Sequence, residues 1–169
     1  MKKMYITTGT LEYLHSVKEK YANEDMVLLE GDDYAVLLHE TDGETVFQEP
    51  RHYEVLDAVG QLGGAFAVFN NIPVTDEGRP LFEYRFSQRA RLIEKEPGFV
   101  AIRVLRPLSN DTYIIMTFWE GKEHFQNWQR SKAYEKAHER REAAKQEEQQ
   151  PTIFPRPSYV TTYTVIRES

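Results

Sequence analysis

The chain has 169 residues, a length typical of one domain or of two small lobes that share a core. It contains no cysteine, which excludes disulfide frameworks, zinc–thiolate sites, iron–sulfur clusters and thiol nucleophiles. The 21 Lys and Arg against 27 Asp and Glu give a net charge of −6, and such a field repels nucleic acid. There is no apolar run of membrane-spanning length and no secretory signal. We therefore expect a cytoplasmic protein that binds neither nucleic acid nor membranes.

The first 62 residues predict the element order β-α-β-β-β-α. The expected elements are a strand at 4–7, a helix at 11–21, a hairpin of strands at 26–29 and 34–38, a strand at 45–48 and a helix at 52–62. Thr10 stands where a helix-capping residue is expected, directly before the first helix. The second helix rests on the helical spacing of apolar residues that begin at Tyr53 and end at Val59.

The second part of the chain predicts a similar order of elements. The expected elements are a strand at 65–72, a helix at 80–95, strands at 99–105 and 112–119, helices at 122–129 and 133–144, and a strand at 158–165. Pro97 and Gly98 end the first of these helices. This is the split β-α-β arrangement of ferredoxin-like domains, so the predicted fold class is α+β.

The bare sheet face of a ferredoxin-like unit predicts how the two parts meet. Helices cover one face of such a sheet, and the other face has to be buried against something. We expect an N-terminal α+β lobe at 1–64 to cap a second lobe at 65–169, which gives a pseudo-dimeric α+β barrel within a monomer. The alternative is an N-terminal extension on a second lobe that forms homodimers.

Two neighbouring amides end the apolar strand at 65–72. Asn70 and Asn71 occupy positions where strand residues are usually apolar, and a buried amide without a partner costs ~1–3 kcal/mol. One of them is therefore a candidate to donate a hydrogen bond into a pocket. The alternative is that both amides belong to the turn toward Pro73.

Other candidate site residues lie further along the chain. His138 carries an imidazole, the side chain suited to bind heme iron, although its charged neighbours also fit a solvated surface position. Phe125 and Trp128 share a helical face, as core or ligand-contact aromatics. Arg85 and Arg89 stand one helical turn apart and suit a carboxylate or propionate, or else solvent.

In their order along the chain, these residues resemble the IsdG-type heme-degrading monooxygenases of the antibiotic biosynthesis monooxygenase superfamily, which are dimeric α+β barrels. The resemblance covers about residues 65–169, and the long N-terminal lobe resembles the HmoB type. The residues and motifs that carry it are Asn70, Arg85-Phe86-Ser87-Gln88-Arg89-Ala90, Glu96-Pro97-Gly98-Phe99, Val104-Leu105-Arg106-Pro107, Phe118-Trp119-Glu120, Phe125-Gln126-Asn127-Trp128 and Ala137-His138.

The resemblance implies roles for individual residues. Asn70 matches the strand asparagine of the family, since Ile72 and Val74 then keep the family's alternation. Trp128 matches its active-site tryptophan, and His138 matches its iron-binding histidine. The heme-pocket residues that the resemblance implies, less uniformly, are Arg85, Phe86 and Arg89.

The implied activity is oxidative opening of heme, which serves as both substrate and cofactor, with O2 and release of iron. Electrons have to come from an external donor, a reductase or ascorbate, because no nicotinamide or flavin fingerprint is present. Two alternatives stay open at this point. One is a heme carrier that does not degrade heme, and the other is a cofactor-free oxygenase of the same superfamily that acts on a small aromatic.

Overall fold

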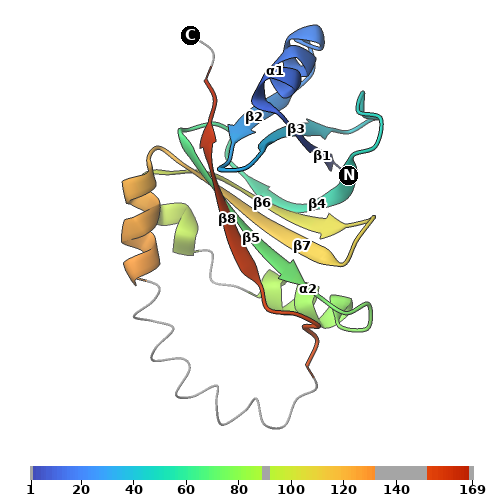
Figure 1. Cartoon of the computed structure of the whole chain (residues 1–169). Coiled ribbons are helices and arrows are strands. Elements are labelled where there is room, and N and C mark those ends of the chain that lie inside the picture. The colour runs from blue at the N-terminus through green and yellow to red at the C-terminus, as the bar shows by residue number, and fades with distance from the viewer. Residues whose placement is uncertain (1, 89–91, 132–151, 168–169) are drawn as a thin grey trace.

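The computed structural model describes residues 2–88, 92–131 and 152–167. Within these residues eight antiparallel strands close into one barrel, in the spatial order β1-β3-β2-β8-β5-β7-β6-β4 (Figure 1). No helix in the described part of the chain has the length and apolar content needed to cross a membrane.

The strands are β1 (Lys3–Gly9), β2 (Met26–Glu30), β3 (Ala35–Thr41), β4 (Arg51–Val59), β5 (Phe66–Pro73), β6 (Phe99–Pro107), β7 (Thr112–Trp119) and β8 (Tyr159–Val165). The helices are α1 (Leu11–Lys20), α2 (Arg79–Ser87), the short 3-10 helix η1 (Leu92–Lys95) and a helix over residues 122–131. As expected, Thr10 caps α1, since its Oγ1 accepts from the Tyr13 backbone N–H at 3.2 Å.

The barrel divides into two sets of four neighbouring strands with the same internal order. The first lobe (up to residue 64) contributes β4-β1-β3-β2, and the second lobe (from residue 65) contributes β8-β5-β7-β6. In both sets the order is fourth, first, third and second along the chain, which is the ferredoxin-like order. The two sets meet at the β4–β6 and β2–β8 seams. The predicted fold class, an α+β barrel built as an internal pseudo-dimer, is confirmed.

The helix predicted at 52–62 is wrong, because this segment forms strand β4. Tyr53 and Val55 face the barrel interior, and β4 pairs with β1 on one side and with β6 on the other. Leu56 lies on the outer face, as the ordinary alternation of a strand predicts, and joins a different apolar cluster there. The register shift between Val55 and Asp57 brings Asp57 to the same face. Apolar residues on both faces of β4 therefore produce a spacing that imitates a helix.

The other differences also fall between strands. The strand predicted at 45–48 is an irregular loop. This loop stands between β3 and β4, where the second ferredoxin-like helix would be expected, and it contains no helix. The helix predicted at 80–95 is interrupted, since α2 extends over Arg79–Ser87 and η1 over Leu92–Lys95. The helix predicted at 133–144 lies outside the described residues.

Side chains of both lobes fill the barrel interior. Neighbouring interior positions alternate along each strand with outward-facing ones, so each sheet places one apolar face inside. The fully buried interior residues include Met4, Ile6, Leu38, Tyr53, Phe69, Leu105, Met116 and Phe118. The face that each lobe would leave bare is thus buried against the other lobe, as the sequence predicts.

A buried ion pair joins the two lobes inside the barrel. Arg103 of β6 donates from Nε to Glu40 Oε2 of β3 at 2.6 Å and from Nη2 to Glu40 Oε1 at 3.3 Å. Its Nη1 donates to the carbonyl oxygens of Val59 and Ile102. Both side chains are more than nine-tenths buried, so each charge depends on the other for its compensation.

Removing one partner of this pair tests its contribution. We expect Glu40→Ala to lower the free energy of unfolding by about 3–5 kcal/mol, because Arg103 is left buried without a counter-charge. Urea denaturation followed by circular dichroism measures the change. The double variant Glu40→Leu with Arg103→Met is the control, and it should lose much less. Equal losses in the single and double variants would contradict the explanation.

Candidate functional site

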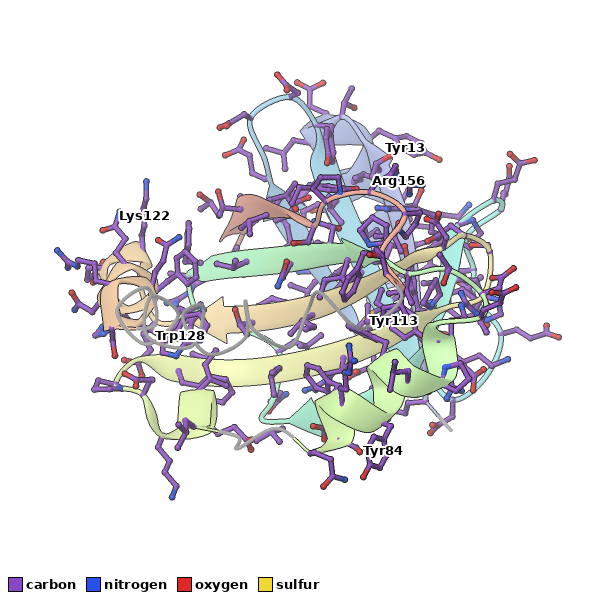
Figure 2. The ribbon with its side chains drawn as sticks, turned by 90° about the horizontal axis from the view of Figure 1, so that it is seen from below. Tyr13, Tyr84, Tyr113, Lys122, Trp128 and Arg156 are labelled. Carbon is purple, nitrogen blue, oxygen red and sulfur yellow. The ribbon has the colours of Figure 1, made fainter. Side chains whose placement is uncertain are left out.

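The outer face of the second-lobe sheet carries two separate apolar clusters. The α2 cluster, beneath α2, consists of Val74, Phe82, Tyr113 and Ile153 with Leu56 and Ile72 at its margin. The aromatic cluster, beneath the helix of residues 122–131, consists of Val68, Trp119 and Phe125 with Phe66, Ile93, Phe99 and Trp128. Figure 2 shows Tyr113 and Trp128 toward opposite ends of the strands that run between the two helices.

Asn70 lies on the strip of sheet between these clusters. On β5 the outward-facing residues are Phe66, Val68, Asn70 and Ile72. The first two belong to the aromatic cluster and Ile72 to the α2 cluster. Asn70 pairs with Ile115 of β7, and both side chains are only half-buried by the described residues. Val160, its neighbour on β8, is 54% exposed. We call this row of outward-facing residues, Asn70 of β5 with Ile115 of β7 and Val160 of β8, the Asn70 strip.

The two candidate amides point in opposite directions. Asn71 faces the barrel interior, where its Nδ2 donates to Phe69 O at 3.2 Å, to Tyr159 O at 3.2 Å and to Thr161 Oγ1 at 3.3 Å. The Asn70 amide has no hydrogen-bond partner among the described residues. Asn71 is therefore a satisfied structural residue, whereas Asn70 has donors and an acceptor available for a ligand.

Trp128 shares this face with Asn70 but belongs to the aromatic cluster. Its ring lies 6.0 Å from that of Trp119 and 6.2 Å from that of Phe125. Trp119 pairs across the sheet with Phe66, four residues before Asn70, which is about 14 Å along a strand. The structure thus places both candidates on one face of the sheet, with the cluster of Trp128 displaced from Asn70 along the strands.

Of the remaining candidate residues, two lie on α2 and two lie outside the described residues. Arg85 is exposed on α2, and Phe86 is half-buried in the next position. The Phe86 ring lies 6.4 Å from that of Phe82, in the α2 cluster. Arg89 and His138 lie outside the described residues.

A cavity of about 230 Å³ lies between α2 and the sheet. Its lining is Leu56, Asp57, Phe82, Glu83, Phe86, Ser87 and Val104. Val104 pairs with Ile115, which pairs with Asn70, so the cavity begins two strands from Asn70, or about 10 Å. The site therefore extends from the Asn70 strip to the space under α2.

Glu83 connects α2 to the sheet beside this cavity. Its carboxylate accepts from both Nε and Nη2 of Arg106, and also from the Tyr113 hydroxyl. The Arg106 guanidinium holds the pKa of Glu83 below its ordinary value, and burial raises the pKa of Tyr113. No local sequence pattern identifies Glu83, because Arg106 and Tyr113 follow it by 23 and 30 residues.

The motif Glu96-Pro97-Gly98-Phe99 has a structural explanation beside this site. Gly98 has a φ of +82°, and a Cβ at this position would come within 2.1 Å of His124 Cγ. Its carbonyl oxygen accepts from the Glu120 backbone N–H at 2.8 Å. The glycine thus lets the start of β6 lie directly against the segment that begins the helix of residues 122–131.

The corresponding face of the first lobe is filled by its own rings. Tyr5 of β1 pairs with His39 of β3 and with His52 of β4, and the Tyr5 and His52 rings stack at 4.7 Å. His39 is fully buried, and its ring nitrogens lie 3.0 Å from Thr45 Oγ1 and from Glu24 Oε2. The two lobes therefore share a fold but differ at this position, and only the second leaves a partly uncovered amide there.

Comparisons with known proteins agree with this architecture. The profile described as antibiotic biosynthesis monooxygenase matches residues 65–140. A heme-degrading monooxygenase of Listeria monocytogenes is 30% identical over 132 residues, which cover 78% of this chain and 79% of that protein. The signal transduction protein TRAP of Staphylococcus aureus is 29% identical over 137 residues, which cover 79% of this chain and 81% of that protein.

Among solved structures, one described as a major regulator of staphylococcal pathogenesis has a TM-score of 0.83 to this chain at 24% identity. The match covers 98% of this chain and 100% of that one, which shows that the two-lobed fold is shared. The chain belongs to the antibiotic biosynthesis monooxygenase family, and its resemblance to a heme-degrading member is confirmed.

The Glu83–Arg106 pair predicts a specific dependence of stability on pH. Because the pKa of Glu83 is lowered from 4.5, the stabilisation is fully present above pH 4.5 and is lost as the pH falls through the lower, folded-state value. We expect the difference in unfolding free energy between the wild type and Glu83→Gln to shrink over this range. Urea unfolding at a series of pH values measures it, and a difference that is constant down to strong acid would contradict the assignment.

Proposed function

We propose that this protein is a heme-degrading monooxygenase that binds one heme on the outer face of its second lobe. In this proposal the ring is opened with O2 and electrons from an external donor, and iron is released. The observation that carries the proposal is the half-buried Asn70 amide, which has no partner among the described residues and is flanked by two apolar clusters. The Listeria relative is named for this activity and supports the same reading.

The proposed roles follow from the position and chemistry of each side chain. Asn70 donates a hydrogen bond from its amide toward the bound substrate, at the centre of an otherwise apolar strip. Trp128 presents its indole from the aromatic cluster against the flat macrocycle. His138 is the proposed ligand of the heme iron, on the residue match alone. Heme itself supplies the redox chemistry, whereas the chain binds and orients it.

The α2 side of the site is proposed to hold the periphery of the substrate. Phe86 adds an aromatic wall to the cavity that lies two strands from Asn70. Arg85 and Arg89 are the proposed partners of the propionate carboxylates, which a guanidinium binds through charge-assisted hydrogen bonds. Arg85 is exposed on α2, so its guanidinium is accessible from solvent.

The negative net charge does not argue against such a substrate. Burial of several hundred Å² of porphyrin surface contributes on the order of 10 kcal/mol, at ~25 cal/mol per Å². The repulsion between a diffuse charge of −6 and two propionates is screened over ~8 Å at physiological ionic strength, so it contributes far less. Apolar residues of this face that are still partly exposed, such as Ile115, Val160 and Trp128, would contribute to this burial.

We further propose that the two lobes have separate tasks. The second lobe, 65–169, is the antibiotic biosynthesis monooxygenase domain that contains the site, and the first lobe, 1–64, takes the place of a second subunit. The stacked Tyr5 and His52 rings and the buried His39 fill the corresponding face of the first lobe, so one chain binds one heme. The electron donor is a reductase or ascorbate.

A role in signalling is the second candidate. The Staphylococcus aureus relatives carry the name signal transduction protein and match nearly the same share of the chain as the Listeria enzyme does. A protein of this kind would use the shared barrel without turning over heme. The hemin experiment below separates the two candidates.

Hemin titration tests the proposed function directly. We expect one hemin per chain with a Soret band, followed by decay of this band and release of iron when ascorbate is added in air. Absorbance spectroscopy with a ferrous-iron chelator measures both steps. A Soret band that persists under these conditions would instead indicate a heme carrier, and the absence of hemin binding would favour a signalling role or a cofactor-free oxygenase.

Single substitutions separate binding from turnover. We expect Asn70→Ala to bind hemin but to degrade it at least tenfold more slowly, because the hydrogen bond to the substrate is lost. His138→Ala should change the Soret position and the ligand-field bands. The control is Asn71→Ala, which removes the interior amide and should lower stability more than it changes the spectrum. Equal effects of Asn70→Ala and Asn71→Ala on turnover would count against the assigned role of Asn70.

The internal pseudo-dimer predicts the mass of the protein in solution. Since each lobe covers the bare face of the other, we expect a monomer near the chain mass of 19.8 kDa. Light scattering at micromolar concentration measures it, with and without hemin. A stable species of twice that mass would contradict the monomer.

A further inference from the structure

Apolar burial alone holds α2 weakly against the sheet. Of its nine residues only Phe82 is buried, whereas Leu81 is 39% exposed and Tyr84 is 64% exposed. Figure 2 shows Tyr84 pointing away from the strands. One large side chain fixes the helix at a point but leaves its tilt and its height over the cavity to other contacts.

Polar anchors on two successive turns of α2 supply these contacts. In the first turn, Arg79 Nη2 donates to Pro107 O at 2.9 Å and to Asn110 O at 3.0 Å. One turn later, the Glu83 carboxylate accepts from Arg106 and from Tyr113. Both anchors attach α2 to the same structure, the hairpin formed by the end of β6 and the start of β7.

These anchoring residues are close neighbours of the Asn70 strip. Arg106 lies two residues after Val104 on β6, and Tyr113 lies two residues before Ile115 on β7, so all four face outward. A displacement of α2 from Arg106 and Tyr113 would therefore change the width of the cavity beside Val104. This contact couples the position of the helix to the shape of the site.

We propose that Glu83 is a positioning residue, which fixes α2 over the sheet and thereby sets the opening of the site that contains Asn70. The inference rests on the proposed function, because the site in question is the proposed heme site. Glu83 does not touch the reacting atoms in this proposal. It acts through Phe82 and Phe86, which are on the same helix and line the same cavity.

The charges around Glu83 explain why another residue cannot take over its role. The groups that face it are Arg79 on α2, Arg106 on β6, Tyr113 on β7 and, from β4, Glu54 and Asp57. Without Glu83, Arg106 retains Glu54, whose Oε2 lies 3.7 Å from its Nη1. Arg106 would then pair with β4 alone, and the fully buried Tyr113 would lose its acceptor on α2.

The experiment compares Glu83→Ala, Glu83→Gln and Glu83→Asp with a matched control, Asp111→Asn. Asp111 lies on the same hairpin, and its carboxylate pairs with Arg156 at 2.8 Å and accepts from Thr112 Oγ1, neither of which belongs to α2. Hydrogen exchange of the ligand-free chain reports on the amides of α2 and, separately, on those of β6 and β7. Hemin titration and ascorbate-driven decay then give the dissociation constant, KM and kcat.

We expect Glu83→Ala to accelerate exchange in α2 and to weaken hemin binding by about tenfold, the effect of losing one charge-assisted interaction. Exchange in β6 and β7 should not change, and KM should rise more than kcat falls. Glu83→Asp should restore part of the affinity. Asp111→Asn should leave α2 exchange and hemin affinity at the wild-type values.

The pH profile tests whether the charge of the Glu83 carboxylate is responsible, and the comparison of α2 exchange with β6 and β7 exchange separates this effect from a general loss of stability. The ratio of hemin affinities between the wild type and Glu83→Gln should approach one in acid, where Glu83 becomes protonated. Unchanged α2 exchange in Glu83→Ala would overturn the inference, as would faster exchange with unchanged hemin affinity. If the wild type binds no hemin, the proposed function fails, and the exchange data alone decide whether Glu83 positions α2.

Discussion

The structure depends on burial of one apolar face from each of two four-stranded sheets. Neither lobe has helices on that face, so neither would be stable with it exposed to water. Met4 and Leu38 from the first lobe pack in the same interior as Phe69 and Met116 from the second. Closure of the barrel therefore fixes the relative position of the lobes. The buried Glu40–Arg103 pair adds a directional constraint, because its bidentate geometry tolerates little sliding.

Closure also decides where a ligand can bind. Since side chains of both lobes fill the interior of the barrel, the candidate site of the described residues lies on an outer face, and the two lobes differ there. In the first lobe the ring of Tyr5 lies between His39 and His52, and the loop between β3 and β4 supplies Thr45 to His39. In the second lobe the apolar clusters stop on either side of Asn70. Pseudo-symmetric folding with this local difference explains why, among the described residues, the candidate amide lies in the second lobe and has no counterpart in the first.

The sequence predicts most of the fold but not all of the candidate site. Periodicity and the capping residue Thr10 identify α1 and the hairpins because those signals are local. The segment after Arg51 misleads, because it forms β4 by pairing with distant strands and carries apolar residues on both faces of that strand. Asn70 is identifiable as an amide within an apolar strand, whereas Glu83 is not, since its partners Arg106 and Tyr113 are brought to it only by folding.

The amino-acid sequence by itself determines the α+β class, the repeated order of elements and the family resemblance, since each depends on spacing along the chain. It also supplies the two adjacent amides. The resemblance selects Asn70 as the candidate, but only the tertiary structure decides which face of the sheet each amide lies on. Strand pairing turns Asn71 into the barrel, where backbone carbonyls satisfy it, and leaves Asn70 on the outer face. The side that a strand residue faces follows from the register of its neighbours, and register is a property of the closed sheet rather than of the local sequence.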